Sequence, residues 1–131
     1  VGAGAFTATL QPGEDPAGTA WRPIHARPRP QAGLTAVASR SHSDVTTETF
    51  LMRLGVKERR SMGSSIKFCL LAEGEADVYP RFGPTMEWDT AAGQAVLEAA
   101  GGRVVTTNGE PLRYGKTSAG LRNPSFIAWG R

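Results

Sequence analysis

The chain has 131 residues, 40% of them hydrophobic and 21% charged, which is sufficient for one folded domain with a core and excludes an intrinsically disordered chain. Its net charge of +3 is compatible with an anionic ligand but too small to argue for nucleic-acid binding. No apolar stretch approaches the roughly 20 residues of a membrane helix. The single Cys69 excludes an internal disulfide and favours a reducing compartment.

Apolar spacing and turn residues divide the chain into alternating strands and helices. We expect a strand within residues 1–10, then a proline-rich loop over 11–33 with at most a short edge strand near 21–26, and a strand at 35–39. A helix at 45–54 capped by Ser43 or Asp44 follows, then a short helix that follows Ser64 or Ser65 and stops at Gly74, and a strand at 76–81. The last expected elements are a helix at 89–100, a hairpin of 103–107 and 111–114 around Asn108-Gly109, and a strand at 126–129. Because strands alternate with helices, the fold class is α/β, in one domain.

The clearest helix is expected at 89–100, where four apolar residues share one face and Gly101-Gly102 ends the element. These four residues are Ala92, Val96, Ala99 and Ala100.

Asp89 stands at the start of this helix and has two competing explanations. An aspartate there ordinarily accepts hydrogen bonds from the unpaired backbone N–H groups of the first turn. Alternatively it holds a cation, although a lone carboxylate does not make a magnesium site. The nearby Glu87 is more simply explained as a surface charge.

Four further polar side chains stand at expected element ends: His42, Ser64, Lys67 and Arg81. Each has an ordinary explanation, namely a turn histidine, a capping serine, a solvated lysine and an arginine stem packed on an aromatic ring. With Asp89 they make three potential cations, a hydroxyl group and one carboxylate. That combination is what a metal-assisted phosphate site would use.

Other polar stretches predict no site. The sequence EDPAGT at 14–19 hints at a metal-binding Asp-Pro-x-Asp-Gly-Thr loop, but its second aspartate is missing, so we interpret it as a plain loop. The basic runs WRPIHARPRP at 21–30 and VKERR at 56–60 are most simply solvated surface.

Three stretches resemble the C-terminal half of the 3'(2'),5'-bisphosphate nucleotidases, a family of inositol monophosphatase-like, lithium-sensitive phosphatases. They are SRSH at 39–42, GSSIKFCLLAEGEADVYPRFGPTMEWDTAAGQAVLEAAGG at 63–102, and LRNPSF at 121–126. The WDTAAG signature is specific to the superfamily, and GSSIKFCLLAEG with YPRFGP is similar to its bacterial bisphosphate nucleotidases.

The resemblance implies a layered α/β phosphatase fold with a mixed sheet and flanking helices. It also implies Mg²⁺-dependent removal of the 3'-phosphate from adenosine 3',5'-bisphosphate in the cytoplasm, either free or at the inner membrane face, as part of sulfur assimilation and nucleotide recycling. Asp89 would be a metal ligand, which favours the second explanation of its position. Asp89, His42, Ser64, Lys67 and Arg81 would also contact the nucleotide or its phosphates.

The family's other metal ligands come from an N-terminal half, a glutamate and an Asp-Pro-x-Asp-Gly-Thr loop, and neither is in these 131 residues. We therefore expect residues 1–131 to be the C-terminal portion of such a domain, to need the N-terminal half as its partner, and to be inactive alone.

Several alternatives stay open. The substrate could instead be inositol monophosphate or a fructose bisphosphate, and the chain could be a non-catalytic module that binds phosphate or nucleotide. A nucleic-acid-binding module is disfavoured, because aromatic residues are not interleaved with Lys and Arg. The oligomeric state is also open, a homodimer included.

Overall fold

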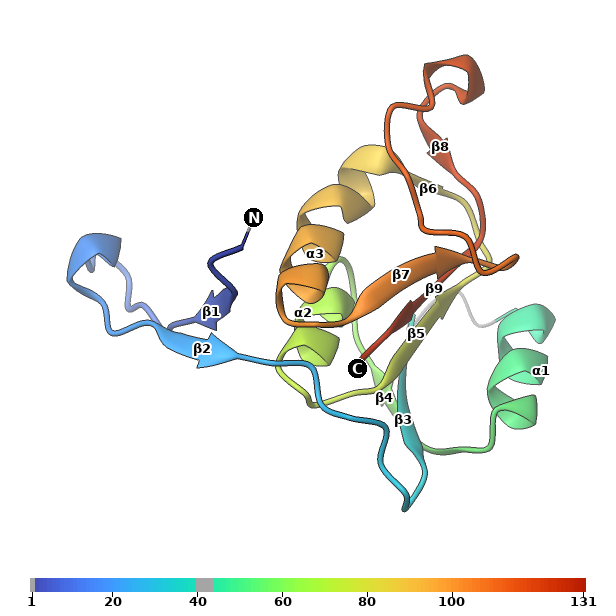
Figure 1. Cartoon of the computed structure of the whole chain (residues 1–131), viewed down its shortest axis with the longest axis horizontal. Coiled ribbons are helices and arrows are strands. Elements are labelled where there is room, and N and C mark those ends of the chain that lie inside the picture. Colours follow the sequence, from blue (N-terminus) through green and yellow to red (C-terminus); the bar gives the residue numbers. More distant parts are fainter. Residues whose placement is uncertain (1, 40–43) are drawn as a thin grey trace.

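A five-stranded mixed sheet with strand order β4-β3-β5-β9-β7 forms the centre of the structure (Figure 1). The computed structural model describes residues 2–39 and 44–131. The strands of this sheet are β3 (Leu34–Ala38), β4 (Val56–Ser61), β5 (Val78–Arg81), β7 (Arg103–Thr106) and β9 (Phe126–Trp129). β3 runs parallel to β4 and β5, whereas β9 runs antiparallel to β5 and β7. The α/β class and the mixed sheet expected from the sequence are confirmed.

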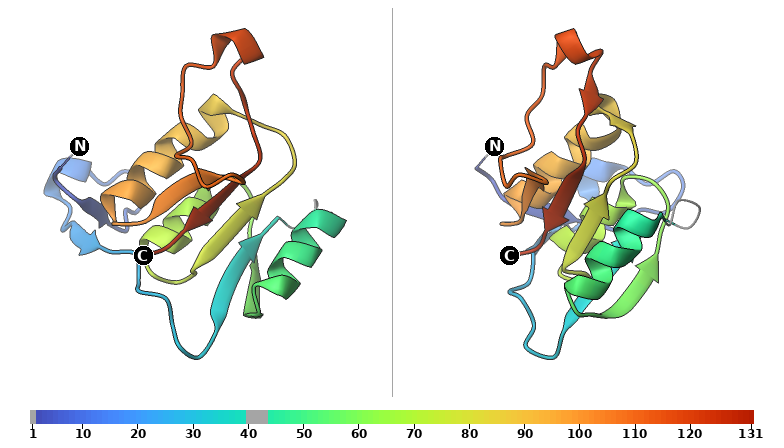
Figure 2. Two further views of the ribbon diagram at one scale, coloured as in Figure 1. Left: turned by 45° about the vertical axis from the view of Figure 1, so that its right-hand side comes forward. Right: turned by 90° about the vertical axis from the view of Figure 1, so that its right-hand side faces the viewer.

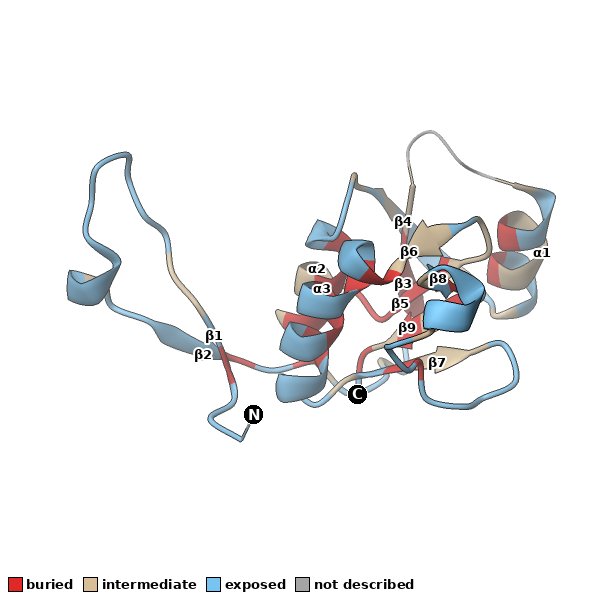
Figure 3. Ribbon diagram, turned by 90° about the horizontal axis from the view of Figure 1, so that it is seen from above, coloured by how far each residue is buried: buried red, intermediate tan, exposed pale blue. Residues whose placement is uncertain are grey.

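Helices cover both faces of this sheet. The three helices of the described residues are α1 (Val45–Arg53), α2 (Ile66–Ala72) and α3 (Glu87–Ala99). Seen from above, α2 and α3 lie on one side of the sheet and α1 on the other (Figure 3). The longest of them, α3, has 13 residues, and none qualifies as a membrane span.

Two small sheets and two short 3₁₀ turns complete the structure. β1 (Ala5–Thr7) and β2 (Arg22–Ile24) pair as an antiparallel ribbon, and β1 contacts α3. The loop between the two strands, which carries the turn η1 (Pro16–Gly18), extends away from the helices (Figure 3). β6 (Thr85–Met86) pairs with β8 (Arg122–Asn123). The segment that carries the turn η2 (Thr117–Ala119) and β8 rises beyond the sheet beside the start of α3 (Figure 2).

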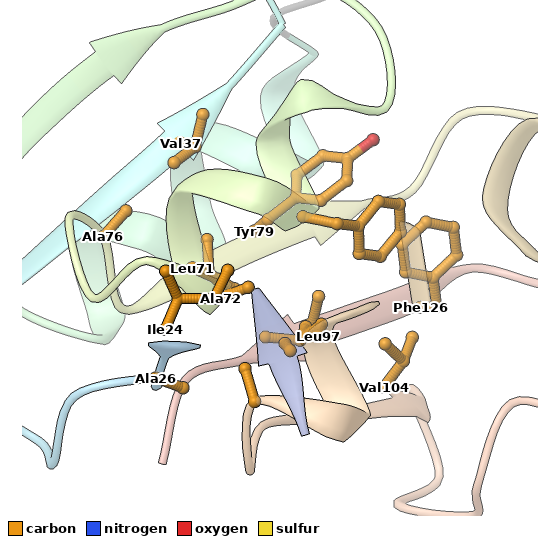
Figure 4. Packing of buried hydrophobic residues seen from close by; sticks show 14 of the residues in the cluster. Ile24, Ala26, Val37, Leu71, Ala72, Ala76, Tyr79, Leu97, Val104 and Phe126 are labelled. Atoms are coloured by element: carbon orange, nitrogen blue, oxygen red, sulfur yellow. The ribbon is translucent and has the colours of Figure 1, made fainter. Parts of the chain in front are cut away.

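The main core lies between the sheet and the helices α2 and α3, and three aromatic rings form its centre (Figure 4). Phe68 of α2 packs on Tyr79 of β5 and Phe126 of β9, with ring centroids 5.3 and 6.0 Å apart. All three residues are at most 5% exposed. Such edge-to-face and offset pairs are favourable beyond their buried area, and they fix α2 against the middle of the sheet.

Local signals placed α1 correctly, whereas β4 was missed. Asp44 caps α1 through a 2.7 Å hydrogen bond from the Thr47 amide to its carboxylate. β4 is the basic run expected as solvated surface, and it is an edge strand paired only with β3. Charged side chains are typical of edge strands and leave no apolar alternation to detect. Arg59 and Arg60 form ion pairs of 2.7 and 2.8 Å with Glu48 and Glu75, respectively.

The second basic run is only partly solvated, because Arg27 forms a bidentate ion pair with the buried Asp77. Its Nε and Nη2 atoms donate to the two carboxylate oxygens over 2.8 and 2.7 Å. The Thr35 amide donates to the same carboxylate over 2.7 Å. Burial alone would raise the pKa of Asp77, but these hydrogen bonds lower it below its ordinary value.

The expected strand at 111–114 is not formed. An isolated antiparallel bridge joins Val105 to Pro111 through hydrogen bonds of 2.7 Å from the Thr106 amide to the Glu110 carbonyl and 3.0 Å from the Leu112 amide to the Val104 carbonyl. The pairing goes no further, because the chain after Leu112 turns to the start of α3, where the Gly115 amide donates to Glu87 over 2.9 Å.

The buried face of α3 differs from the predicted apolar face. Its buried residues are Glu87, Thr90, Gly93, Gln94 and Leu97, with Ala100 buried at the C-terminal cap, whereas Ala92, Val96 and Ala99 are exposed. The cause is close packing on α2: a side chain at Gly93 would place its Cβ 2.5 Å from Cδ2 of Phe68. The helix therefore turns Gly93, its smallest residue, toward α2.

Replacing Gly93 by alanine tests this packing, because helix propensity and packing predict opposite signs. Helix propensity alone would make a variant with alanine in place of an interior glycine about 1 kcal/mol more stable. Overpacking against Phe68 costs about 1–3 kcal/mol. We expect Gly93→Ala to lower the free energy of unfolding, measured by urea denaturation. A more stable variant would contradict the close approach of α2 and α3.

Candidate functional site

A polar pocket lies where β5 ends and where α2 and α3 begin. Its volume is about 570 Å³. Its lining includes Ser39, Gly63, Ser64, Ser65, Lys67, Tyr79, Arg81, Thr85, Trp88, Asp89 and Thr90. Four of the five predicted site residues therefore share one pocket, although they come from three separate elements. The fifth, His42, lies outside the described residues.

The topology explains why these residues meet. β3 and β5 are parallel, so Ser39 after β3 and Arg81 at the end of β5 reach the same edge of the sheet. Ser64, two residues before α2, has a φ of 54°, a left-handed conformation that non-glycine residues rarely adopt. Such strain costs of order 1–3 kcal/mol and occurs preferentially at functional positions.

Lys67 lines the pocket and is buried without an acidic partner in the described part of the chain. It is only 3% exposed, and its Nζ atom donates to the Met62 carbonyl over 3.2 Å. Nζ also lies 5.0 Å from the centroid of the Tyr79 ring. Burial lowers the pKa of Lys67, and the positive charge of Arg81 lowers it further. None of the ion pairs among the described residues includes Lys67, so an anionic ligand would supply the charge that this ammonium group lacks.

Arg81 also presents an unused donor. Its Nη2 atom donates to the Pro84 carbonyl over 3.2 Å, which orients the guanidinium group. Its Nε atom is buried and has no hydrogen-bond partner within the described part of the chain. A buried donor without an acceptor is rare in proteins, and a phosphate oxygen would satisfy it.

Asp89 uses one carboxylate oxygen to stabilise its helix. It is the third residue of α3 rather than its cap, and its Oδ2 atom accepts a 2.8 Å hydrogen bond from the amide of Met86, the N-cap residue. Its Oδ1 atom accepts no hydrogen bond from residues 2–39 or 44–131. Helix capping and cation binding are thus compatible, because each can use a different oxygen.

Asp89 alone would not complete a metal site. Within the described ranges, no group of three His, Cys, Asp or Glu side chains is arranged to hold an ion. A divalent ion at Oδ1 would therefore need phosphate, water or protein ligands from elsewhere. An exposed carboxylate oxygen is the donor that Mg²⁺ prefers, so the residue fits the role.

Tyr79 is a pocket residue that the sequence analysis did not single out. Burial raises its pKa to about 12, with a smaller upward contribution from Asp89 and a downward one from Arg81. The Nζ atom of Lys67 lies over the Tyr79 ring. Tyr79 precedes Arg81 by two positions, so both side chains lie on the same face of β5. That spacing in YPRFGP was the only available signal.

Glu87 is not the surface charge that was expected, because it is 9% exposed and fully bonded. Its carboxylate accepts hydrogen bonds of 2.9 and 3.0 Å from the Gly115 and Lys116 amides. It also forms a 2.5 Å ion pair with Nζ of Lys116, which donates to the Arg113 carbonyl as well. The Lys116 side chain and these amides lower the pKa of Glu87 to about 2. Glu87 therefore attaches the loop over residues 113–117 to α3.

A buried hydrogen-bond network behind the pocket holds the start of α3. The Asn123 amide donates to the Thr90 hydroxyl over 3.0 Å and to the Met86 carbonyl over 2.9 Å. The Tyr114 hydroxyl donates to the Gln94 side chain over 2.8 Å. These contacts explain why Thr90 and Gln94 are buried although they are polar.

The EDPAGT stretch is a loop, as expected. Asp15 accepts a 2.9 Å hydrogen bond from the Ala17 amide and caps the turn η1. All residues from Glu14 to Gly18 are exposed.

Comparison with known proteins identifies close relatives. A family model described as the inositol monophosphatase family matches residues 3–128. The chain is 53% identical over 90 residues to the 3'(2'),5'-bisphosphate nucleotidase CysQ of Escherichia coli strain K12, and 59% identical over 86 residues to an uncharacterized protein in the pss 5' region of Rhizobium leguminosarum bv. phaseoli. These alignments cover 69% and 63% of this chain, respectively.

The structure also resembles solved structures. CysQ from Bacteroides thetaiotaomicron, a bacterial member of the inositol monophosphatase family, is 43% identical with a TM-score of 0.82 over 98% of this chain. The chain spans 51% of that protein, 36% of the E. coli relative and 90% of the Rhizobium protein.

The ion pair of Glu87 predicts how stability depends on pH. The pKa of Glu87 falls from an ordinary 4.5 to about 2 on folding, so its stabilisation is complete above about pH 5 and is lost as the pH falls toward 2. We expect Glu87→Gln to be less stable than the wild type at pH 7, with a difference that shrinks between pH 5 and 2. Urea denaturation across this range measures the difference.

The matched control is Glu110→Gln, because Glu110 is exposed and its side chain makes no hydrogen bond or ion pair with the described residues. It should differ little from the wild type at any pH. A stability loss of Glu87→Gln that stayed constant down to pH 2 would contradict a native carboxylate with a lowered pKa.

Proposed function

Because this chain belongs to the inositol monophosphatase family, we propose that it supplies the phosphate-binding part of a Mg²⁺-dependent phosphatase that converts adenosine 3',5'-bisphosphate to AMP and phosphate. The observation that carries the proposal is the pocket in which Lys67, Arg81 and Asp89 each have an unused charge or donor. Relatives at 43–53% identity are named CysQ, and the E. coli protein is named as a 3'(2'),5'-bisphosphate nucleotidase.

In this proposal the two cations of the pocket hold the phosphate to be removed. The ammonium group of Lys67 approaches from the base, where low exposure strengthens its attraction for a phosphate oxygen. The Nε atom of Arg81 donates to a second oxygen, and the contact of Nη2 with Pro84 keeps the guanidinium plane fixed. Preorganised donors of this kind also stabilise charge that develops on the phosphoryl group.

The rim of the pocket accommodates the nucleoside. The Ser64 hydroxyl can bond a ribose or phosphate oxygen, and His42 is proposed to do the same from outside the described residues. Trp88 is 66% exposed and lines the pocket next to Asp89, so its indole ring is available to a base. This apolar ring suits a nucleotide better than it suits inositol phosphate.

Asp89 is proposed to hold Mg²⁺ through its Oδ1 atom. When bound, the ion would supply charge neutralisation at the phosphate and a water molecule of lowered pKa. Oδ2 keeps the carboxylate in place through its bond to the Met86 amide. The chain offers no second carboxylate beside Asp89 within its described residues, since Glu87 is occupied by Lys116.

We further propose that residues 1–131 correspond to the C-terminal half of the domain and that the remaining ligands and the groups that activate water belong to its other half. The activity is expected in the cytoplasm, and the 131 residues alone should bind phosphate weakly and release none.

Asp89→Asn in the full-length enzyme tests the metal role separately from capping. The asparagine keeps an oxygen that accepts the Met86 N–H group but loses the charge that holds the cation. We expect Mg²⁺-dependent phosphate release from adenosine 3',5'-bisphosphate to fall by roughly two or more orders of magnitude. The melting temperature should stay close to that of the wild type.

The matched control for this variant is Asp15→Asn, which changes another capping aspartate outside the pocket. It should leave turnover unchanged. Full activity of Asp89→Asn would reduce Asp89 to a capping residue. Faster release from inositol monophosphate than from the nucleotide in the wild type would favour the inositol phosphatase alternative.

Lys67→Met tests whether the buried ammonium serves the ligand or the fold. Losing one charged phosphate contact should lower kcat/KM by about 10- to 100-fold. A buried charge without an acidic partner does not stabilise a fold, so we expect an unchanged or higher melting temperature. The control Lys57→Met removes an exposed lysine from β4 and should change neither quantity. A destabilised Lys67→Met variant with normal kcat/KM would contradict the proposal.

A further inference from the structure

A second cationic cavity lies at the opposite end of β5 from the candidate site. Its volume is about 240 Å³, and four arginines line it together with Asp77 and Trp129. The arginines are Arg27, Arg29, Arg103 and Arg131. Asp77 comes immediately before β5 and Arg81 ends it, so the two cavities are about 13 Å apart along the strand. One phosphate group cannot occupy both.

Backbone pairing fixes the positions from which these arginines project. Arg103 pairs with Trp129 across β7 and β9, which places both side chains on the same face of the sheet. The Gly130 amide donates to the Asp77 carbonyl over 2.8 Å, and the Arg131 amide donates to the Arg27 carbonyl over 3.1 Å. The convergence therefore follows from the fold and not from one chance side-chain conformation.

The cavity carries more positive charge than its own acidic group can balance. The Asp77 carboxylate is 4% exposed and already accepts both donors of Arg27 and the Thr35 amide. Arg29, Arg103 and Arg131 make no ion pair within the described residues. These three guanidinium groups are exposed, so water screens their mutual repulsion, but together they give the cavity a positive potential that attracts an anion.

We propose that this cavity is a second binding site, selective for a small, multiply charged oxyanion of the phosphate class. Guanidinium groups bind such oxyanions through paired N–H donors, and several around one centre favour a multiply charged ligand over chloride. A volume of about 240 Å³ equals that of roughly eight water molecules, which leaves room for one such ion and part of its hydration shell. The site does not depend on the proposed phosphatase activity.

The test follows the indole N–H resonance of Trp129 by two-dimensional NMR while pyrophosphate, inorganic phosphate or AMP is added to the purified protein. Arg29→Gln/Arg103→Gln removes two exposed arginines of the cavity, and Arg22→Gln/Arg53→Gln removes two exposed arginines elsewhere. We expect a saturable shift with pyrophosphate and a dissociation constant about tenfold higher in the first double variant, since two exposed charged contacts of roughly threefold each are lost. The second double variant should stay within about twofold of the wild type.

The Lys67→Met variant tests whether this site is independent of the candidate active site. In that variant, pyrophosphate should still shift the Trp129 resonance as it does in the wild type. If pyrophosphate binds more tightly than AMP, the cavity binds the free anion. If AMP binds more tightly than pyrophosphate, the cavity binds the phosphate of a nucleotide. Either result supports the site. If the Arg29/Arg103 variant melts early, Arg29→Gln alone should still weaken binding. The proposal is overturned if Trp129 does not respond, if both double variants weaken binding equally, or if Lys67→Met abolishes the shift.

Discussion

The packing of Phe68 is the contact on which both the core and the candidate site depend. Its ring lies between Tyr79 of β5, Phe126 of β9 and the bare backbone of Gly93 in α3. Because Phe68 follows Lys67 directly, the same contact that brings α2 onto the sheet also sets the Lys67 ammonium over the Tyr79 ring. α3 can approach only because residue 93 has no side chain, and this approach carries Asp89 to the pocket. One close-packed junction therefore gathers residues from three elements.

The pocket combines features that each lower stability. Among residues 2–39 and 44–131, Lys67 is buried without a carboxylate and the Nε atom of Arg81 has no acceptor, and Ser64 adopts a left-handed backbone conformation. A fold retains such features where a ligand compensates them, and unsatisfied groups that converge on one cavity are typical of functional sites. Beside the pocket, the Glu87 and Thr90 side chains are hydrogen-bonded by the segment that follows β7.

Elements with local signals were predictable from the sequence, and those defined by tertiary contacts were not. The cap at Asp44 and the alternation of strands and helices were enough to place α1 and the α/β class. β4 escaped because an edge strand can be almost wholly charged. The buried face of α3 escaped because a glycine and hydrogen-bonded polar residues give no hydrophobic signal. The candidate site residues Ser64, Lys67 and Arg81 were proposed from their places at element ends and from family resemblance, whereas the burial of Lys67 and the contact of its ammonium group with the Tyr79 ring required the structure.

The most direct measurement of the central claim is a crystal structure of the full-length protein grown with Mg²⁺ and inorganic phosphate. We expect phosphate bonded to Nζ of Lys67 and Nε of Arg81, with the ion held by the oxygen of Asp89 that does not bond Met86. A phosphate bound elsewhere, with Nζ of Lys67 still bonded only to the Met62 carbonyl and Asp89 bonded only to its own helix, would contradict it.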